Sequence, residues 1–137
     1  MSDDDRSPRP ADDPDLIELA TRLFGYARAG DTAALGAYLD AGVPADLTND
    51  KGDSLIMLAA YHGHAATVAR LCASGADADR LNDRGQSPLA GAVFKGEDDV
   101  VAVLLDHGAD PAAGTPSAIE TAHMFHKTHY LRRFSAE

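Results

Sequence analysis

Two stretches of the chain, thirty-three residues apart, have nearly the same sequence: NDKGDSLIMLAAYHG at residues 49–63 and NDRGQSPLAGAVFKG at residues 82–96. In both, Asn, Asp, a basic residue, Gly and Ser come in the same order, and an Ala, an aromatic residue and a Gly follow. Self-similarity at a fixed period of roughly 20–50 residues indicates stacked copies of one small structural unit.

Glycines keep the same phase along the whole chain. A glycine that follows a helix lets the backbone turn through a positive φ, so regularly spaced glycines mark regularly spaced helix ends. Three such series repeat at the period of the two stretches: Gly30, Gly63 and Gly96; Gly42, Gly75 and Gly108; and Gly52 with Gly85.

Apolar residues between these glycines recur at helical spacing, as Leu16, Leu19 and Leu23 do in the first segment. Asp15, Asp31, Ser54 and Ser87 stand where N-caps are needed, and Pro88 suits the first helical position. We therefore expect two helices and a loop in each copy. The expected helical segments are residues 16–30, 32–42, 55–63, 64–75, 88–96 and 97–108, with one helix and a shortened second one in 117–137.

Several short motifs identify the type of repeat. Gly75-Ala76-Asp77 and Gly108-Ala109-Asp110 follow the second helices, and Gly63-His64 lies between two helices. Ser87-Pro88-Leu89-Ala90 opens a first helix. With the period, these motifs resemble the ankyrin repeat, in a small four-repeat form of the bacterial type, over about residues 15–134. In this family a histidine of the opening motif links neighbouring loops, but Met57 and Ala90 occupy its place here.

The resemblance implies an all-α ankyrin-repeat solenoid of stacked helix-turn-helix units with hairpin-like loops. We expect a disordered acidic tail at residues 1–14 and an ankyrin-repeat domain at 15–137. Within that domain, 15–48 is the N-terminal capping repeat, 49–81 and 82–114 are full repeats, and 115–137 is the C-terminal capping repeat.

Each copy alone buries too little surface, so neighbouring copies should close a shared apolar core. Gly91 within a helix costs about 1 kcal/mol relative to Ala, and we expect close packing by the adjacent copy to require it. The predicted core is Leu19, Leu23, Leu35, Leu39, Leu55, Ile56, Leu58, Ala59, Val68, Leu71, Cys72, Leu89, Ala92, Val93, Val100, Val101, Leu104, Leu105, Ile119, Ala122, Leu131 and Phe134.

Composition narrows the class of partner. The net charge of −10 disfavours nucleic acid and anionic membranes, because binding to either needs clustered Lys and Arg. It fits either a solvated acidic surface that keeps the protein soluble, which is the simpler explanation, or a partner with a basic surface. No secretory signal or spanning segment is evident, and Cys72 is the single cysteine, so we expect a cytoplasmic protein. We also expect a monomer, with self-association through exposed aromatic residues as the alternative.

No motif in the sequence predicts catalysis or a cofactor. There is no Gly-rich phosphate loop followed by Lys, and Cys72 falls on an apolar helix face where an inert thiol is expected. We therefore expect a protein that is not an enzyme. His123, His126 and His129 leave one alternative open, a metal or small-ligand site, although a spacing of three drifts around a helix.

The resemblance also implies where a partner binds. In ankyrin repeats the two residues before the stop glycine face the inner, concave surface, and the loop tips help to grip a partner protein. Two alternatives remain: an inhibitor or antitoxin-like regulator of one specific enzyme, and a purely structural role in which Tyr61 and Phe94 lean together to fill gaps. The candidate partner-binding residues are Arg28, Tyr61, His62, Phe94, Lys95, Met124 and Phe125 from the helices, and Asp50, Lys51, Asp53, Asp83, Arg84 and Gln86 from the loop tips.

Overall fold

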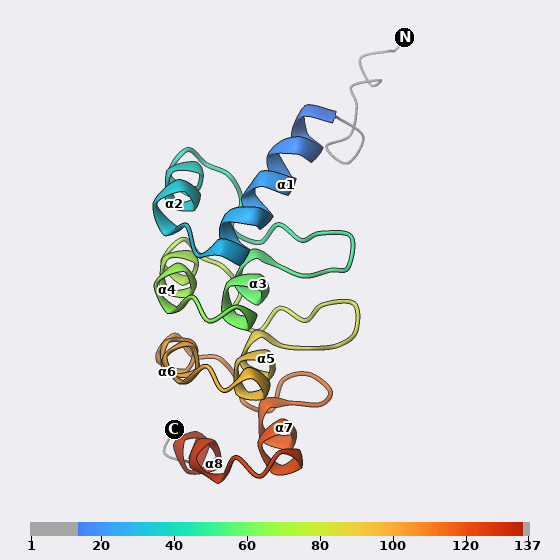
Figure 1. The fold of residues 1–137 in the computed structure, drawn as a ribbon, viewed down its shortest axis with the longest axis vertical. Helices are drawn as coiled ribbons and strands as arrows, with labels where there is room; N and C mark the ends of the chain where they lie inside the picture. The colour runs from blue at the N-terminus through green and yellow to red at the C-terminus, as the bar shows by residue number, and fades with distance from the viewer. Residues whose placement is uncertain (1–13, 136–137) are drawn as a thin grey trace.

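A computed structural model describes residues 14–135 and shows helical pairs stacked along one axis (Figure 1). Within that range the chain forms eight helices and no β-strand, only two isolated antiparallel bridges, Thr48 with Ser54 and Gly114 with Ser117. The helices are α1 (Pro14–Ala29), α2 (Thr32–Asp40), α3 (Leu55–Tyr61), α4 (Ala65–Ala73), α5 (Pro88–Lys95), α6 (Asp98–Asp106), α7 (Ala118–Met124) and α8 (Thr128–Ser135).

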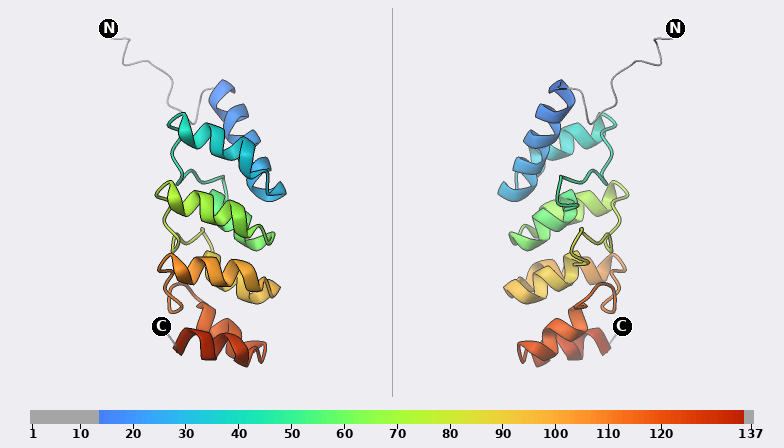
Figure 2. Two further views of the ribbon diagram at one scale, coloured as in Figure 1. Left: turned by 90° about the vertical axis from the view of Figure 1, so that its left-hand side faces the viewer. Right: turned by 90° about the vertical axis from the view of Figure 1, so that its right-hand side faces the viewer.

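The helices form two layers. α1, α3, α5 and α7 stack on one another as the inner layer, and α2, α4 and α6 stack beside them (Figures 1 and 2). Long loops project from the stack on the side of the inner layer, roughly perpendicular to the stacking axis (Figure 1). This arrangement confirms the predicted all-α solenoid of repeated helical pairs.

The expected helix starts are largely confirmed. The side chain of Asp31 accepts from the backbone N–H of Ala34, and Ser54 and Ser87 accept in the same way from the third residue beyond each. At the helix start expected from Ser117, the structure adds a full capping box, in which Ser117 and Glu120 each accept from the other's backbone N–H. α1 begins at Pro14, so the expected cap at Asp15 is wrong. The rest of the expected acidic tail, residues 1–13, lies outside the described residues.

The six stop glycines have the positive φ that their phase predicted, between 73° and 103°. At the last turn His126 takes this role, with φ 57°. Histidine is among the residues more often found in this region, although at some cost compared with glycine.

The core runs through the stack between the two layers, and most of the predicted residues are buried in it. Leu19, Cys72, Ile119 and Leu131 are only partly buried, contrary to the prediction. Three of these four belong to the first or last helical pair, which has a neighbour on one side only. The prediction missed the buried residues Phe24, Ala27, Ala45, Met57, Ala60, Ala90, Ala109, Ala118 and Tyr130.

Hydrogen bonds also join successive repeats. The backbone N–H of Asp77 donates to the Asp46 carboxylate at 2.8 Å, and the N–H of Asp110 donates to Asp79 at the same distance. The Asp of each Gly-Ala-Asp motif therefore meets a carboxylate of the preceding repeat. These hydrogen bonds fix the register of successive repeats in addition to the apolar packing between them.

Candidate functional site

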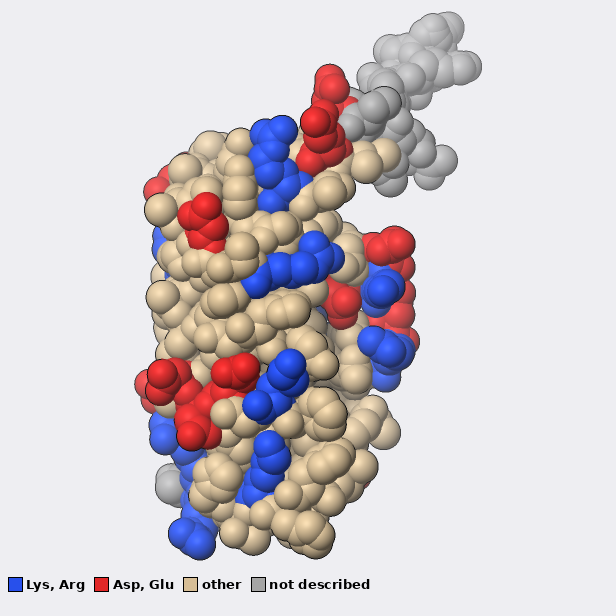
Figure 3. Space-filling view, viewed as in Figure 1, with Lys and Arg blue, Asp and Glu red and all other residues tan. Residues whose placement is uncertain are grey.

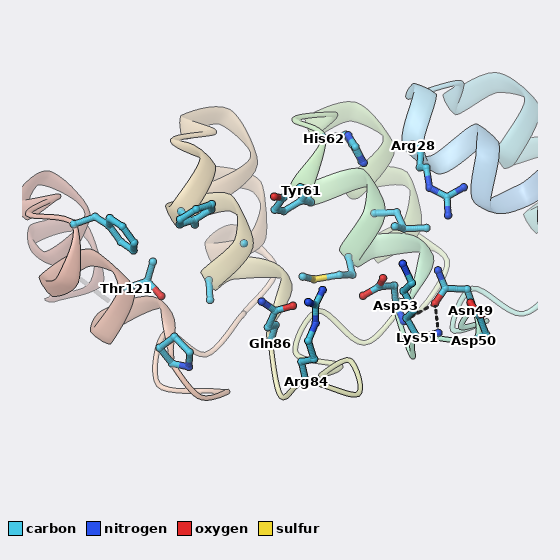
Figure 4. A pocket seen from close by; sticks show the side chains of 17 residues that line it. Arg28, Asn49, Asp50, Lys51, Asp53, Tyr61, His62, Arg84, Gln86 and Thr121 are labelled. Carbon is cyan, nitrogen blue, oxygen red and sulfur yellow. Dashed lines mark hydrogen bonds between the residues drawn. The ribbon is translucent and has the colours of Figure 1, made fainter.

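A groove of about 680 Å³ lies between the inner helices and the loops (Figure 4). Its helical wall comes from α3, α5 and α7 with the end of α1, and its other wall comes from the loops. The lining residues are Arg28, Asn49, Asp50, Lys51, Asp53, Met57, Leu58, Tyr61, His62, Arg84, Gln86, Ala90, Gly91, Phe94, Pro116, Thr121 and Phe125.

Ten of the thirteen predicted residues line this groove; Asp83, Lys95 and Met124 do not. The ammonium of Lys95 lies 4.7 Å from the centre of the Tyr61 ring, outside the groove lining. Met124 lines a separate hollow of about 470 Å³ beside Glu120 and His123. Asp83 lies in the second loop, where its backbone N–H donates to the carbonyl of Lys51.

The sequence reading missed part of the groove floor. Met57, Ala90 and Thr121 each stand four residues before a predicted aromatic position, so they share its helix face. The same spacing of four residues, applied to the sequence, would have predicted these three positions. The other missed lining residues are Asn49, Leu58, Gly91 and Pro116.

The expectation that close packing by the adjacent copy requires a glycine at Gly91 is wrong. A Cβ built there would lie 3.4 Å from the terminal methyl carbon of Met57 and 3.5 Å from Cδ1 of Tyr61. These are ordinary van der Waals distances, so the adjacent copy does not require a glycine. The missing side chain instead leaves the floor of the groove open.

Each of the two long loops is closed by an asparagine at its base. The side-chain oxygen of Asn49 accepts from the backbone N–H groups of Lys51 and Asp53, at 3.0 and 2.9 Å (Figure 4). Asn82 accepts in the same way from Arg84 and Gln86, at 3.0 Å each. Asn49 and Asn82, the equivalent asparagines of the two repeated stretches, thus stabilise the turn at each loop tip.

The loops are also tied to one another. The amide of Asn82, which is 8% exposed, donates to Asp53 and to Gln86 at 2.8 Å each. The backbone N–H of Asp83 donates to Lys51 at 3.1 Å, and that of Thr115 donates to Gly85 at 2.9 Å. These bonds link the loops although the motif's histidine is absent. A wall fixed in this way loses little conformational entropy when it binds a ligand.

Three cations of the groove are unpaired. The side chains of Arg28, Lys51 and Arg84 make no hydrogen bond or ion pair with any residue in the range 14–135. Burial, followed by the charges of His64, Lys95 and Arg28, lowers the pKa of His62. His62 is therefore a neutral side chain near pH 7, and the positive charge comes from the arginines and the lysine.

Two aromatic residues of the groove, Phe94 and Phe125, pair beside α7. Phe94 and Phe125 are 48% and 46% exposed, and their ring centres lie 5.2 Å apart at 74°. Tyr61 contacts His62 edge-on, with ring centres 5.5 Å apart. The gap-filling alternative needed Tyr61 against Phe94, but the ring that packs against Phe94 is Phe125.

The remaining candidate sites are not assembled. His123 lies in α7, His126 in the turn, and His129 in α8, 3.9 Å from Asp98. Among residues 14–135, no group of three or more His, Cys, Asp or Glu side chains is placed to hold a metal ion. Cys72 is partly buried rather than fully buried, and burial raises the pKa of its thiol, which disfavours the reactive thiolate.

No helix in residues 14–135 combines the length and the apolar character that crossing a membrane requires.

Among solved structures, this chain is similar to the human ASB11 ankyrin repeat domain, whose crystal structure superimposes with a TM-score of 0.62 at 30% identity. That match covers 65% of this chain and 40% of the ASB11 chain.

A curated ankyrin repeat protein of Pseudomonas aeruginosa, PA3287, is 52% identical over 62 residues. The match covers 45% of this chain and 36% of PA3287, so the chain spans well under two thirds of the relatives it matches. The family model for ankyrin repeats, in three copies, matches residues 23–114, which is more than half of the chain. This chain belongs to the ankyrin repeat family.

Proposed function

We propose that this protein binds another protein in the groove between its inner helices and loop tips, and that it catalyses no reaction. Ankyrin repeats generally serve as non-catalytic modules for protein–protein interaction. The observation that carries the proposal for this chain is the groove itself: half-exposed Phe94 and Phe125 face the same space as unpaired Arg28 and Arg84.

Exposed aromatic and arginine side chains are the residue types that dominate binding energy at interfaces. Large apolar side chains in water are also unfavourable unless something covers them. The hydrogen-bonded loops keep the opposite wall in place before binding. We therefore place the binding energy in Tyr61, Phe94 and Phe125, with the loop tips giving specificity.

The experiment is a double substitution, Tyr61→Ala with Phe94→Ala, followed by chemical cross-linking in extract of the native cell. We expect an unchanged helical circular dichroism spectrum and loss of the cross-linked species. The matched control is Leu16→Ala with Ile17→Ala, which removes two comparably exposed side chains, 43% and 48%, from the far end of α1.

Cross-linking that survives the Tyr61 and Phe94 substitutions would contradict the proposed site. Unfolding of that variant would assign the two rings to the core instead. If the captured partner is an enzyme whose activity falls in the complex, the protein is an inhibitor of the kind left open by the sequence. We expect the free protein to be a monomer, which light scattering would check.

A further inference from the structure

We propose that the groove binds an acidic segment of its partner: an extended peptide with carboxylates near α1 and an apolar side chain near α7. This inference rests on the proposed function and adds the chemistry and direction of the bound segment. It differs from what the net charge alone suggests, since that charge favours a basic partner.

The charged end of the groove carries an excess of cations. Arg28 extends from the end of α1, and Lys51 and Arg84 come from the loops of the opposite wall, Arg84 beside Gln86 (Figure 4). Only Asp50 and Asp53 oppose them in the lining, and one oxygen of Asp53 already accepts from the amide of Asn82. With three cations against two carboxylates, the lining has a small excess of positive charge on a chain of net charge −10.

Arg70, outside the groove, is one arginine that the chain satisfies with its own groups. Arg70 donates to the carboxylate of Asp40, to the hydroxyl of Ser74 and to the carbonyl of Gly36. Arg28 and Arg84 have no such partner in the described part of the chain. A guanidinium presents paired N–H donors that match a carboxylate, so two free arginines in the lining of one groove are suited to carboxylate side chains.

The other end of the groove is apolar. Phe94 and Phe125 stand half-exposed there, and the floor beside them is open at Gly91 next to Met57. A side chain entering this space would cover both rings. The two ends therefore set the order of the segment: carboxylates toward α1 and an aromatic or aliphatic residue toward α7.

The net charge of −10 favours insertion of a short acidic segment over contact with a broad acidic surface. Figure 3 shows acidic side chains spread over the visible face, with basic ones interspersed. Long-range repulsion between like charges is screened beyond a Debye length of about 8 Å at physiological salt. Contacts inside the groove are much shorter than that, so an inserted acidic peptide is attracted where a large acidic surface would be repelled.

The test is to pan phage-displayed short random peptides on the full chain and to measure the enriched peptides by fluorescence anisotropy. We expect enrichment of Asp or Glu together with an aromatic or aliphatic residue. The charge reversal Arg28→Glu with Arg84→Glu should weaken binding about tenfold or more. The matched control, Arg80→Glu with Arg132→Glu, makes the same change in net charge at exposed arginines outside the groove.

A charge swap makes the test sharper. A synthetic peptide with Lys in place of its Asp and Glu should bind the Arg28→Glu, Arg84→Glu variant better than it binds the unmodified protein. Phe94→Ala should weaken the acidic peptide without changing its preference for acidic residues.

Enrichment of basic peptides, or equal loss of binding in the control variant, would overturn the inference. If peptide binding depends on Phe94 and Tyr61 but is unchanged by the Arg28→Glu, Arg84→Glu substitutions, the groove is a binding site but has no preference for acidic segments, and the inference is wrong. A complete absence of groove-dependent peptides also overturns the inference, while the cross-linking experiment above decides the proposed function separately.

Discussion

The Nε2 atom of His64 lies 2.8 Å from the backbone carbonyl oxygen of Arg28, one repeat earlier in the stack. The bond connects His64, which precedes α4, with the last turn of α1. The carbonyl belongs to Arg28, whose side chain is one of the cations of the groove. Lys127 makes the equivalent link two repeats on, donating to the carbonyl of Phe94 at 3.2 Å. Side chains at the turns therefore hold the ends of the inner helices that carry the candidate binding residues.

His64→Ala should lower the free energy of unfolding by about 0.5–1.5 kcal/mol, the usual net value of one hydrogen bond. Urea unfolding measures it. His107→Ala is the matched control, since His107 occupies an exposed position after α6 and lacks any such bond in the described part of the chain. Equal effects of the two substitutions would show that the bond to Arg28 contributes nothing.

Leu71→Ala should destabilise the protein by about 2–5 kcal/mol, because truncating a buried leucine loses apolar contacts and leaves a cavity. Leu71 is 0% exposed in the core, whereas Leu81 is 42% exposed and serves as control. Denaturant midpoints of the two variants compare them directly. A loss at Leu71 no larger than the loss at Leu81 would exclude it from the core.

Tyr130 links stability to alkaline pH. Its hydroxyl donates to the carboxylate of Asp98, and burial first, then Asp98, raises the pKa of this phenol. The folded state therefore holds the proton more tightly than the unfolded chain does. The stability that this group contributes is fully present below the ordinary tyrosine pKa of about 10 and is lost as the pH rises through the folded value.

Tyr130→Phe should consequently be less stable than the unmodified protein by about 1–2 kcal/mol near neutral pH. The difference should shrink above a pH of about 10. Urea unfolding from neutral to alkaline pH checks both statements. A constant difference across that range would show that the phenol does not titrate differently in the folded state.

Asp79 carries a charge that the fold disfavours. Burial, together with the neighbouring Asp110 and Asp77, raises the pKa of this carboxyl, although the N–H of Asp110 donates to it and acts the other way. With a raised folded pKa, the group contributes stability only at acid pH and loses that contribution as the pH rises through the folded value.

Asp79→Asn should therefore be as stable as the unmodified protein or more stable near neutral pH, because the amide oxygen still accepts from Asp110 without the charge. Asp79→Ala removes the acceptor and should be less stable than the Asn variant. Thermal unfolding midpoints rank the variants, and a ranking with Ala above Asn would refute this account.

Gly91→Ala separates folding from binding. Replacing a glycine inside a helix by alanine should stabilise the protein by up to about 1 kcal/mol, and the new methyl group has room at ordinary contact distance. Because that methyl group raises the floor of the groove, affinity for groove peptides should fall. Gly25→Ala in α1, where a Cβ meets nothing within 4 Å, should stabilise without changing affinity.

Much of the architecture follows from the sequence because it depends on local, periodic features. Regularly spaced glycines took the positive φ they predicted, and Ser54 and Ser87 capped the helices they precede. The ends of the solenoid were harder to predict. A leucine such as Leu19 has the same helical spacing as Leu23 but is only partly buried, since no further repeat covers the first helix.

The sequence by itself determined the repeat, the helical pairs and the glycine turns that end the helices, since each depends on residues within one copy or at one fixed period. Only the tertiary structure decided which residues share a groove. It paired Phe94 with Phe125, turned Lys95 onto Tyr61, and left Arg28 and Arg84 unpaired. The physical reason is that these contacts join side chains from different copies, and their distances depend on how the copies stack.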